Sequence, residues 1–467
     1  NNPSKPNSLV DNRIYSITSD LDGIIWVGTA GGASRFIFSK NPFHFFSNID
    51  FIQKNKLMTD RIYTMYAGKQ DKLFIGGFDG LEMIDLKNEK FKVIKKDNKN
   101  FERQTENFVR SVIESKNGKL WIGTSYHGLF EYDPESGNTK QFIYNSHDTT
   151  SISNNGITSI LEDKKGNIWV GTWWGFNRYY KETGKFKRYL PNHDKKNTFG
   201  HSLIWTIYED SEGIIWIGTD GGGVNTYHPG EDKITHFTFG GEENQLSNNR
   251  VFCIYESKNK IMWFGTNDGL IAYNRINKKY RVYNKKIGLS GNLVNSILED
   301  DNSNIWVGTE SGLSKINPQT EEISVISKRD GLLGSEFSQN VAVKTSDGFF
   351  YFGYRKGIVY FHPDSIHFRK SNAPIVFTDL KIFNKSVPIE KDGILQQSIF
   401  NTESLRIPPD NDVITIDFAF LSYFNTKNHL YKYKLEGFDK DWNNIGSRNS
   451  ATYTNLPPGE YKFKVAA

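Results

Sequence analysis

One segment recurs eight times along the 467-residue chain, and its period restricts the possible folds more than any other feature. Each copy contains an alternating apolar segment, an acidic or glycine-containing turn, an apolar segment around Trp-X-Gly-Thr, and a third segment that begins at a glycine. One aromatic residue marks each copy, and neighbouring marks are 43 to 48 residues apart: Trp26, Phe74, Trp121, Trp169, Trp216, Trp263, Trp306 and Tyr351. This period is that of a four-stranded blade, so the repeats predict a β-propeller.

The best-defined copies predict the strands of such a blade. Residues 157–160 alternate between apolar and polar, as in a strand whose two faces have different surroundings. Residues 167–171 are mostly large and apolar or β-branched, as in a strand that is covered on both faces. We expect the marker residues, called here the tryptophan column, to fill the space between adjacent blades. The glycine two residues later allows close backbone approach or a positive φ.

Eight copies fit either eight blades, or seven blades and one copy that belongs to a neighbouring propeller. We favour seven, because the chain begins abruptly at the start of a blade, as if other sequence preceded it. The repeats are expected over residues 1–371 and a smaller domain over residues 372–467, joined by a linker at residues 372–374.

The smaller domain is also predicted to consist of strands. The expected strands cover residues 375–383, 413–420, 430–435 and 461–465, and proline-rich turns lie at residues 408–409 and 457–459. About 95 residues with this pattern predict an immunoglobulin-like β-sandwich. Because Ala467 falls inside or just after a strand, we expect this domain to be incomplete. The whole chain is therefore predicted to be all-β.

The composition of the chain argues against nucleic acid as a partner. The formal net charge is +5, and the lysines are spread through loops and mixed with acids, so no nucleic-acid footprint is present. This mild excess fits a solvated surface, although it could also favour an acidic ligand. The sequence has no apolar run of membrane-spanning length and no signal peptide, so any membrane attachment would lie in flanking segments outside this chain.

The apparent catalytic and cofactor motifs of the sequence each lack residues that the corresponding site would need. Cys253 occupies a column that otherwise holds serine or threonine, which predicts a small buried residue and not a nucleophile. Residues 20–23 (DLDG) begin like a calcium loop but lack its remaining ligands, and they recur as a hairpin turn. Residues 221–223 (GGG) are followed by no helix and no Lys-Ser/Thr pair. The ten histidines lack zinc-site spacing, so we expect no metal and no cofactor.

The repeats resemble a known family. Copies of the form IxxDxxGxxWxGTxxG are similar to the two-component regulator propeller repeat. Residues 417–467 resemble the three-tyrosine (Y_Y_Y) domain, with the tyrosine pattern carried by Tyr431, Tyr433, Tyr453 and Tyr461. The order of the two signatures resembles the periplasmic sensor region of hybrid two-component systems.

This resemblance implies a function. Such sensors typically have two seven-bladed propellers, a three-tyrosine domain, a transmembrane helix and a cytoplasmic histidine kinase, and they detect oligosaccharides released from glycans. For this chain the resemblance implies a periplasmic location, an oligosaccharide ligand, a homodimer through the C-terminal domain and signalling to a membrane-linked kinase. With about one propeller and no kinase motif, the chain is expected to be a fragment without kinase activity.

Variable loops on one face of the propeller supply the candidate ligand-binding residues, because the loop before the first strand and the loop between the second and third strands share a face. The predicted ligand-binding residues are Trp173, Trp174, Tyr126, His127, Arg250, Tyr354 and Arg355. Trp173 and Trp174 lie outside the tryptophan column and suit sugar stacking, although packing under a neighbouring loop is the alternative. Arg250, Arg355 and Arg61 could bind a carboxylate or sulfate, or form ordinary surface ion pairs. Trp205, near the channel, fits a core role better.

Three functions remain open at this point. The favoured one is a non-catalytic oligosaccharide sensor. A polysaccharide lyase or glycosidase would need a base such as His127 or His201 close to an arginine. The third is a protein-interaction scaffold.

Overall fold

The computed structural model describes residues 8–20, 22–36, 41–47, 57, 59, 61–88, 90–94, 108–191, 201–237, 250–366, 373–423 and 429–467. Its regular structure is almost entirely β, as predicted. The chain divides into two compact units: Asn41–His367 forms one, and the segments Asn1–Lys40 and Phe368–Ala467 form the other. The expected domain boundary at residues 371 and 372 lies outside the described residues.

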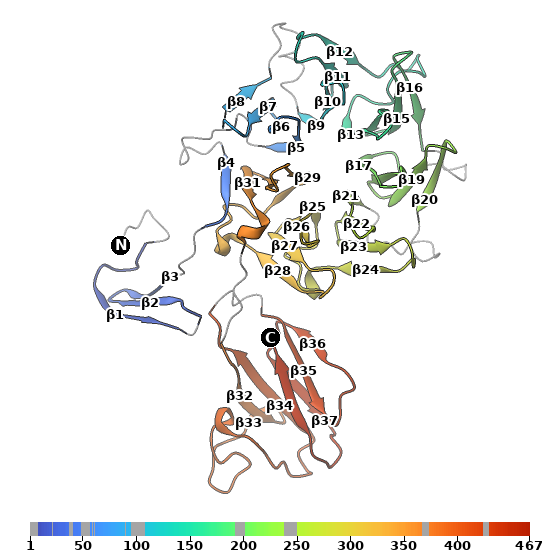
Figure 1. The fold of residues 1–467 in the computed structure, drawn as a ribbon. Helices are drawn as coiled ribbons and strands as arrows, with labels where there is room; N and C mark the ends of the chain where they lie inside the picture. The colour runs from blue at the N-terminus through green and yellow to red at the C-terminus, as the bar shows by residue number, and fades with distance from the viewer. Residues whose placement is uncertain are drawn as a thin grey trace. The chain divides into compact units, whose positions relative to one another are not determined.

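The unit Asn41–His367 is a ring of seven four-stranded antiparallel sheets in the described part of the chain (Figure 1). We number these sheets blades 1 to 7. Blade 1 consists of β5 (Ile62–Ala67), β6 (Lys72–Gly77), β7 (Gly80–Asp85) and β8 (Lys90–Val93). Blade 2 consists of β9 (Val109–Glu114), β10 (Leu120–Thr124), β11 (Leu129–Tyr132) and β12 (Thr139–Phe142). Blade 3 consists of β13 (Ile157–Glu162), β14 (Ile168–Thr172), β15 (Gly175–Tyr180) and β16 (Lys185–Tyr189).

Blades 4 to 7 follow the same order. Blade 4 consists of β17 (Ile204–Glu209), β18 (Ile215–Thr219), β19 (Val224–His228) and β20 (Lys233–Phe237), and blade 5 of β21 (Val251–Glu256), β22 (Ile261–Thr266), β23 (Gly269–Asn274) and β24 (Tyr280–Tyr283). Blade 6 consists of β25 (Val294–Glu299), β26 (Ile305–Thr309), β27 (Leu313–Ile316) and β28 (Ile323–Ile326). Blade 7 consists of β29 (Phe337–Lys344), β30 (Phe350–Tyr354), β31 (Gly357–Phe361) and β4 (His44–Ser47). Short 3-10 helices lie at η1 (Lys285–Ile287), η2 (Lys328–Asp330) and η3 (Pro363–Ser365).

Blade 7 closes the ring with a strand from the other end of the unit. Strand β4 pairs antiparallel with β31, so that Phe46 lies opposite Ile358 and His44 lies opposite Tyr360. The rings of Phe46 and Tyr360 stack with centroids 4.6 Å apart. The prediction of seven blades plus one further copy is therefore confirmed. The further copy, around Trp26, forms the separate sheet β1 (Ile14–Ser19), β2 (Ile25–Thr29) and β3 (Gly32–Phe36).

The tryptophan column fills the space between blades, as predicted. The five tryptophans of blades 2 to 6 are at most 2% exposed: Trp121, Trp169, Trp216, Trp263 and Trp306. The glycine that follows each one is needed because the next blade approaches closely. A Cβ at Gly123 would lie 2.5 Å from the side chain of Ile157, and a Cβ at Gly171 would lie 2.8 Å from that of Ile204. None of these column glycines has a positive φ, so close approach is their role.

An aspartate in the first turn of several copies binds the indole of the same copy. The indole Nε1 groups of Trp26, Trp169, Trp216 and Trp306 donate to Asp20, Asp163, Asp210 and Asp300, at 2.9, 2.9, 2.7 and 2.8 Å. Blade 5 has Ser257 at this position, and the buried Nε1 of Trp263 has no acceptor among the described residues. The recurring acidic turn of the sequence is thus a structural device and not a metal loop.

A glutamate at the end of the inner strand connects each of blades 2 to 6 to the blade before it. Its carboxylate accepts a hydrogen bond from a backbone N–H in the first turn of the preceding blade. The pairs are Glu114 with Lys69, Glu162 with Lys116, Glu209 with Lys164, Glu256 with Ser211, and Glu299 with Lys258, at 2.8, 2.7, 2.8, 2.7 and 2.9 Å. These contacts join blades 1 to 6 in order, on the side opposite to the variable loops.

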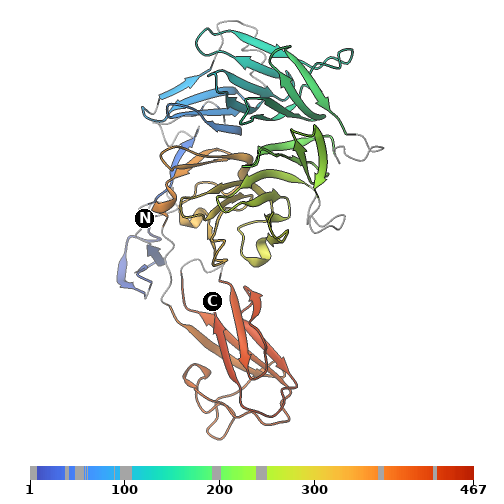
Figure 2. The same cartoon turned by 45° about the vertical axis from the view of Figure 1, so that its right-hand side comes forward.

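The C-terminal part of the other unit is a β-sandwich, as predicted. One sheet has the order β33-β32-β34-β37 and the other β36-β35-β38 (Figure 1, Figure 2). The strands are β32 (Ile375–Ile382), β33 (Lys385–Ser386), β34 (Val413–Phe420), β35 (Tyr431–Glu436), β36 (Asn443–Gly446), β37 (Ser450–Thr454) and β38 (Lys462–Ala466), with η4 at Ile399–Asn401.

The tyrosine pattern lies largely in the core of this sandwich. Tyr431, Tyr433 and Tyr453 are 8%, 8% and 6% exposed and pack around Phe418. The hydroxyl of Tyr453 donates to Oδ2 of Asp439 at 2.6 Å, and the backbone N–H of Leu435 donates to the same oxygen. The tyrosines are therefore structural in this domain.

Candidate functional site

The two faces of the propeller differ in their exposed apolar side chains. We call the face that carries the loops before the inner strands and between the second and third strands the loop face. Among the described residues, the exposed large apolar side chains in these loops are Phe78, Tyr126, Ile143, Tyr144, Trp174, Leu190, Ile287 and Leu333. The loops of the opposite face contribute Ile276. Exposed apolar surface that gathers on one side is a sign of a binding surface.

Five rings on the loop face of blades 1 to 3 form an aromatic arc, which we define as Phe78, Phe108, Tyr126, Trp173 and Trp174. Phe78 contacts Phe108 with ring centroids 4.6 Å apart, Phe108 contacts Tyr126 at 5.9 Å, and Tyr126 contacts Trp173 at 5.5 Å. All three contacts are edge-to-face. Tyr126 is 55% exposed and Trp174 is 53% exposed, so the arc presents aromatic surface to solvent.

The two neighbouring tryptophans of the arc have different surroundings. Trp173 is half-buried, and its ring covers Gly156, where an added Cβ would lie 2.4 Å from the indole. Its backbone N–H also donates to the carbonyl of Gly156 at 2.9 Å. Trp173 thus packs under a neighbouring loop, which was the alternative considered for it, while Trp174 offers its ring to solvent.

The threonine of the repeated Gly-Thr pair makes the loops of this face rigid. In blade 2, Oγ1 of Thr124 donates to the carbonyl of Gly128 at 3.0 Å and accepts from the backbone N–H of His127 at 2.9 Å. In blade 3, Oγ1 of Thr172 donates to Gly175 at 3.0 Å and accepts from the N–H of Trp174 at 3.0 Å. The candidate side chains therefore extend from well-ordered turns, which limits the entropy lost on binding.

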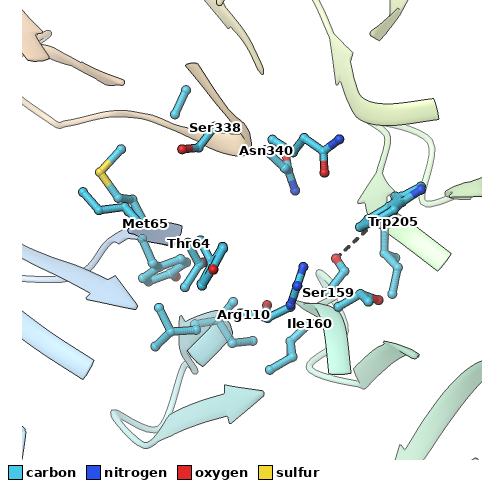
Figure 3. A pocket seen from close by; sticks show the side chains of 18 of the residues that line it. Thr64, Met65, Arg110, Ser159, Ile160, Trp205, Ser338 and Asn340 are labelled. Carbon is cyan, nitrogen blue, oxygen red and sulfur yellow. Dashed lines mark hydrogen bonds between the residues drawn. The ribbon is translucent and has the colours of Figure 1, made fainter. Parts of the chain in front are cut away.

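A cavity of about 1000 Å³ occupies the centre of the ring (Figure 3). Inner-strand residues of several blades line it, and Figure 3 shows Arg110 and Asn340 extending toward it from opposite sides, with Trp205 at its edge. Nε of Arg110 donates to Oγ of Ser125 at 3.0 Å, and its guanidinium carbon lies 5.0 Å from the ring centroid of Tyr63.

Sequence reasoning missed Arg110. It directly precedes the column of the inner strand that holds serine, threonine or Cys253. Blades 1 and 3 to 6 have unlike residues at the same position: Tyr63, Thr158, Trp205, Phe252 and Asn295. This variation within an otherwise regular repeat was a usable signal, because a position with a shared structural role keeps a shared residue type.

The candidate arginines and Trp205 differ in their pairing. Nε of Arg250 forms an ion pair with Asp220 at 3.0 Å, and the indole of Trp205 donates to the same carboxylate at 3.1 Å. Arg355 is well exposed, and its closest carboxylate contact is Glu336, at 3.9 Å. Arg250 is thus neutralised locally, while Arg355 is held weakly. The structure does not place Arg250 in the aromatic arc.

Tyr354 is not in an exposed loop, which corrects the expectation for this residue. It is the last residue of β30 and only 3% exposed, and an added Cβ at Gly334 would lie 2.3 Å from its ring. Burial raises the pKa of Tyr354 to about 12. Its side chain belongs to the core between blades 6 and 7.

The expectation for Cys253 is consistent with its surroundings. Cys253 is 3% exposed, and burial raises the pKa of its thiol well above its ordinary value. A buried, protonated thiol is a poor nucleophile. Within the described ranges, no group of three or more histidine, cysteine, aspartate or glutamate side chains could hold a metal ion. No helix among those residues is long and apolar enough to cross a membrane.

Comparison with known families identifies both modules. Residues 104–126, 151–174, 198–221, 245–268 and 288–311 match the two component regulator propeller family, and residues 422–467 match the Y_Y_Y domain family. The chain carries two-component regulator propeller repeats followed by a Y_Y_Y domain. The resemblance noted from the sequence is therefore confirmed for both modules.

Solved structures and a curated relative agree with these modules. The extracellular domain of the putative hybrid two-component system BT3049 of B. thetaiotaomicron aligns with a TM-score of 0.63 and 25% identity, over 98% of this chain and 59% of that one. The histidine kinase P4 of Formosa agariphila is 33% identical over 132 residues, which are 28% of this chain and 10% of that protein. This chain therefore spans less than two thirds of either relative.

An enzyme shares the propeller fold at lower similarity. A catalytically inactive variant of virginiamycin B lyase from Staphylococcus aureus aligns with a TM-score of 0.52 and 14% identity, over 68% of this chain and 98% of that one. At this identity the likeness concerns the fold alone.

Proposed function

We propose that this chain is the extracytoplasmic sensing module of a hybrid two-component system, and that it binds an oligosaccharide on the loop face of its propeller. The observation that carries the proposal is the aromatic arc, because an exposed indole or phenol ring on a rigid turn is suited to stacking against a sugar ring. The two matched modules and the likeness to an extracellular sensor domain support the sensor role.

The rest of the proposed mechanism follows from this role. The module lies in the periplasm, forms a homodimer through its C-terminal domain and signals to a membrane-linked histidine kinase outside this chain. Ligand binding acts by favouring one of two arrangements of that dimer, which requires a difference in affinity between them. The module itself is non-catalytic in this proposal, and it needs neither a cofactor nor a metal.

Calorimetric titration against a panel of oligosaccharides, with product analysis, tests the proposal. We expect binding without turnover, and a loss of affinity of about tenfold in Trp174→Ala, equivalent to one lost stacking contact of about 1.4 kcal/mol. Ile276→Ala removes an exposed apolar side chain from the opposite face and serves as the matched control.

Three outcomes contradict the proposal. Unsaturated or reducing-end products would indicate a lyase or glycosidase. Absence of binding to every oligosaccharide would favour a protein-interaction scaffold. Equal affinities for Trp174→Ala and Ile276→Ala would exclude the aromatic arc as the binding surface.

A further inference from the structure

Arg110 is held in a fixed orientation at the centre of the propeller. Oγ of Ser125 binds its Nε, and the ring of Tyr63 lies below its guanidinium group. These two contacts leave the terminal nitrogens directed toward the cavity, as Figure 3 shows for the side chain as a whole. A guanidinium fixed in this way loses little conformational freedom when it binds a ligand.

Arg110 forms no ion pair with a carboxylate of the described residues, and its contacts there are with Ser125 and Tyr63. Arg61 also lines the cavity, and its exposed side chain has no carboxylate partner in the same ranges. Arg355 adds a third cation, 3.9 Å from the exposed carboxylate of Glu336. Glu114 and Glu162 also line the cavity, but their carboxylates accept hydrogen bonds from the turns on the side opposite to the loop face. Near the loop face, three guanidinium groups and the weakly held Glu336 therefore favour an anion.

The arginine and the aromatic arc form one continuous surface. Tyr63, on which Arg110 lies, has its ring centroid 5.9 Å from that of Phe108, a member of the arc. Phe108 in turn contacts both Phe78 and Tyr126. A ligand on this surface would therefore meet aromatic rings and an unpaired guanidinium within the reach of a few sugar units.

We propose that the ligand is an acidic oligosaccharide, with a carboxylate or sulfate group bound by Arg110 and a neighbouring sugar ring stacked on the aromatic arc. This inference rests on the proposed function and narrows its ligand class. Arg61 and Arg355 supply further positive charge at the cavity. A guanidinium fork matches two oxygens of a carboxylate or sulfate, which a neutral sugar lacks.

Titration of the whole chain with four probes tests this inference. The acidic probes are an alginate tetrasaccharide, which carries carboxylates, and a heparin-derived tetrasaccharide, which also carries sulfates; the neutral probes are cellotetraose and laminaritetraose. We expect the acidic probes to bind more tightly, and their affinity to fall with added salt because exposed charges are screened. Arg110→Gln should weaken their binding about 10- to 100-fold, as expected for hydrogen bonds between charged groups.

Two further variants make the result specific. Lys279→Gln removes one exposed positive charge from the opposite face and should leave affinity unchanged. Arg110→Lys keeps the charge but loses the fork, so we expect an intermediate affinity. Circular dichroism and the thermal unfolding midpoint identify any variant that fails to fold, in which case Arg61→Gln takes its place.

The possible failures are distinguishable. If cellotetraose or laminaritetraose binds as tightly as the acidic probes, or if Arg110→Gln binds the acidic probes like Lys279→Gln, the acidic-ligand inference is overturned while the proposed function stands. If none of the four probes binds, this inference is overturned, and the oligosaccharide panel described above decides separately whether the proposed function stands. A preference for the heparin-derived probe over the alginate probe supports sulfate as the bound group, and the reverse supports carboxylate.

Discussion

Replacing Asp163 with serine tests whether the turn aspartates stabilise the propeller through the indole. Asp163 is 2% exposed and accepts hydrogen bonds from Nε1 of Trp169 at 2.9 Å, and from the backbone and side-chain nitrogens of Asn167 at 2.8 and 2.7 Å. Serine occurs naturally at this position in blade 5, where Oγ of Ser257 accepts from the N–H of Ile261 at 3.2 Å. Asp163→Ser should therefore keep the turn but leave the buried indole without an acceptor.

The expected loss of stability follows from these contacts. A hydrogen bond to a charged group contributes about 1.5–3 kcal/mol, so we expect Asp163→Ser to lower the free energy of unfolding by about 2 kcal/mol at pH 7. Asp133→Ser is the matched control, because Asp133 accepts from two backbone N–H groups in an exposed turn and contacts no indole. Its effect should be much smaller.

The effect of Asp163→Ser should also depend on pH. Burial by itself raises the pKa of Asp163, but hydrogen bonds from Trp169 and Asn167 outweigh it and hold the pKa below its ordinary value. A carboxylate with a lowered folded-state pKa stabilises the fold fully above the unfolded-state pKa of about 3.9. This stabilisation is lost as the pH falls through the folded-state pKa, so the difference between wild type and variant should shrink below about pH 4.

Urea unfolding at several pH values, followed by indole fluorescence and far-ultraviolet circular dichroism, measures both effects. The reasoning is refuted if Asp163→Ser is no less stable than Asp133→Ser at pH 7. It is also refuted if the difference between wild type and Asp163→Ser stays constant from neutral pH to pH values below the ordinary aspartate pKa.

The remaining stability predictions concern one buried donor and one buried hydroxyl. Ser257→Asp supplies an acceptor for the indole of Trp263 and should raise the free energy of unfolding by about 1 kcal/mol, whereas Ser257→Ala should not; equal unfolding midpoints for these two variants would contradict this. Tyr453→Phe removes the hydrogen bond to Asp439 and should destabilise the C-terminal sandwich by about 1–3 kcal/mol. Tyr461→Phe removes an exposed hydrogen bond to the carbonyl of Pro457 and should lower the stability of the sandwich by less than Tyr453→Phe does. A larger loss of stability in Tyr461→Phe would show that burial of the hydroxyl does not determine the size of the effect.

Much of the fold could be predicted from the sequence, because its main determinants are local. The tryptophan column and the period indicated eight copies of a propeller repeat, which fit seven blades and one further copy as well as eight blades. The predicted strands at residues 375–383 and 413–420 agree with β32 and β34 within one residue. Closure of the ring could not be predicted in this way. Strand β4 has four residues, and its partner β31 lies more than 300 residues later in the chain, so no local pattern connects them.

The candidate site was predicted less completely. Trp174 and Tyr126 are exposed on the loop face, as their positions after the Gly-Thr pair indicated. Tyr354 instead replaces the threonine of that pair, directly after Gly353, so it lies on β30 and is buried, and Gly334 leaves room for its ring. Arg110 was missed because a polar residue in an alternating strand is usually an ordinary surface residue, and its contacts with Ser125 and Tyr63 depend on packing between strands.

The borrowed outer strand of blade 7 makes the propeller sensitive to tension. No covalent bond joins β4 to β31, so the outer edge of blade 7 depends on one short strand pair and the stacking of Phe46 on Tyr360. A pulling force applied to the chain before Asn41 would act on this fastening first, and its release would leave β31 as an open edge. Blade 7 would then keep three strands, while the pairing within the other six sheets and the packing of β29 and β30 against blade 1 remained intact.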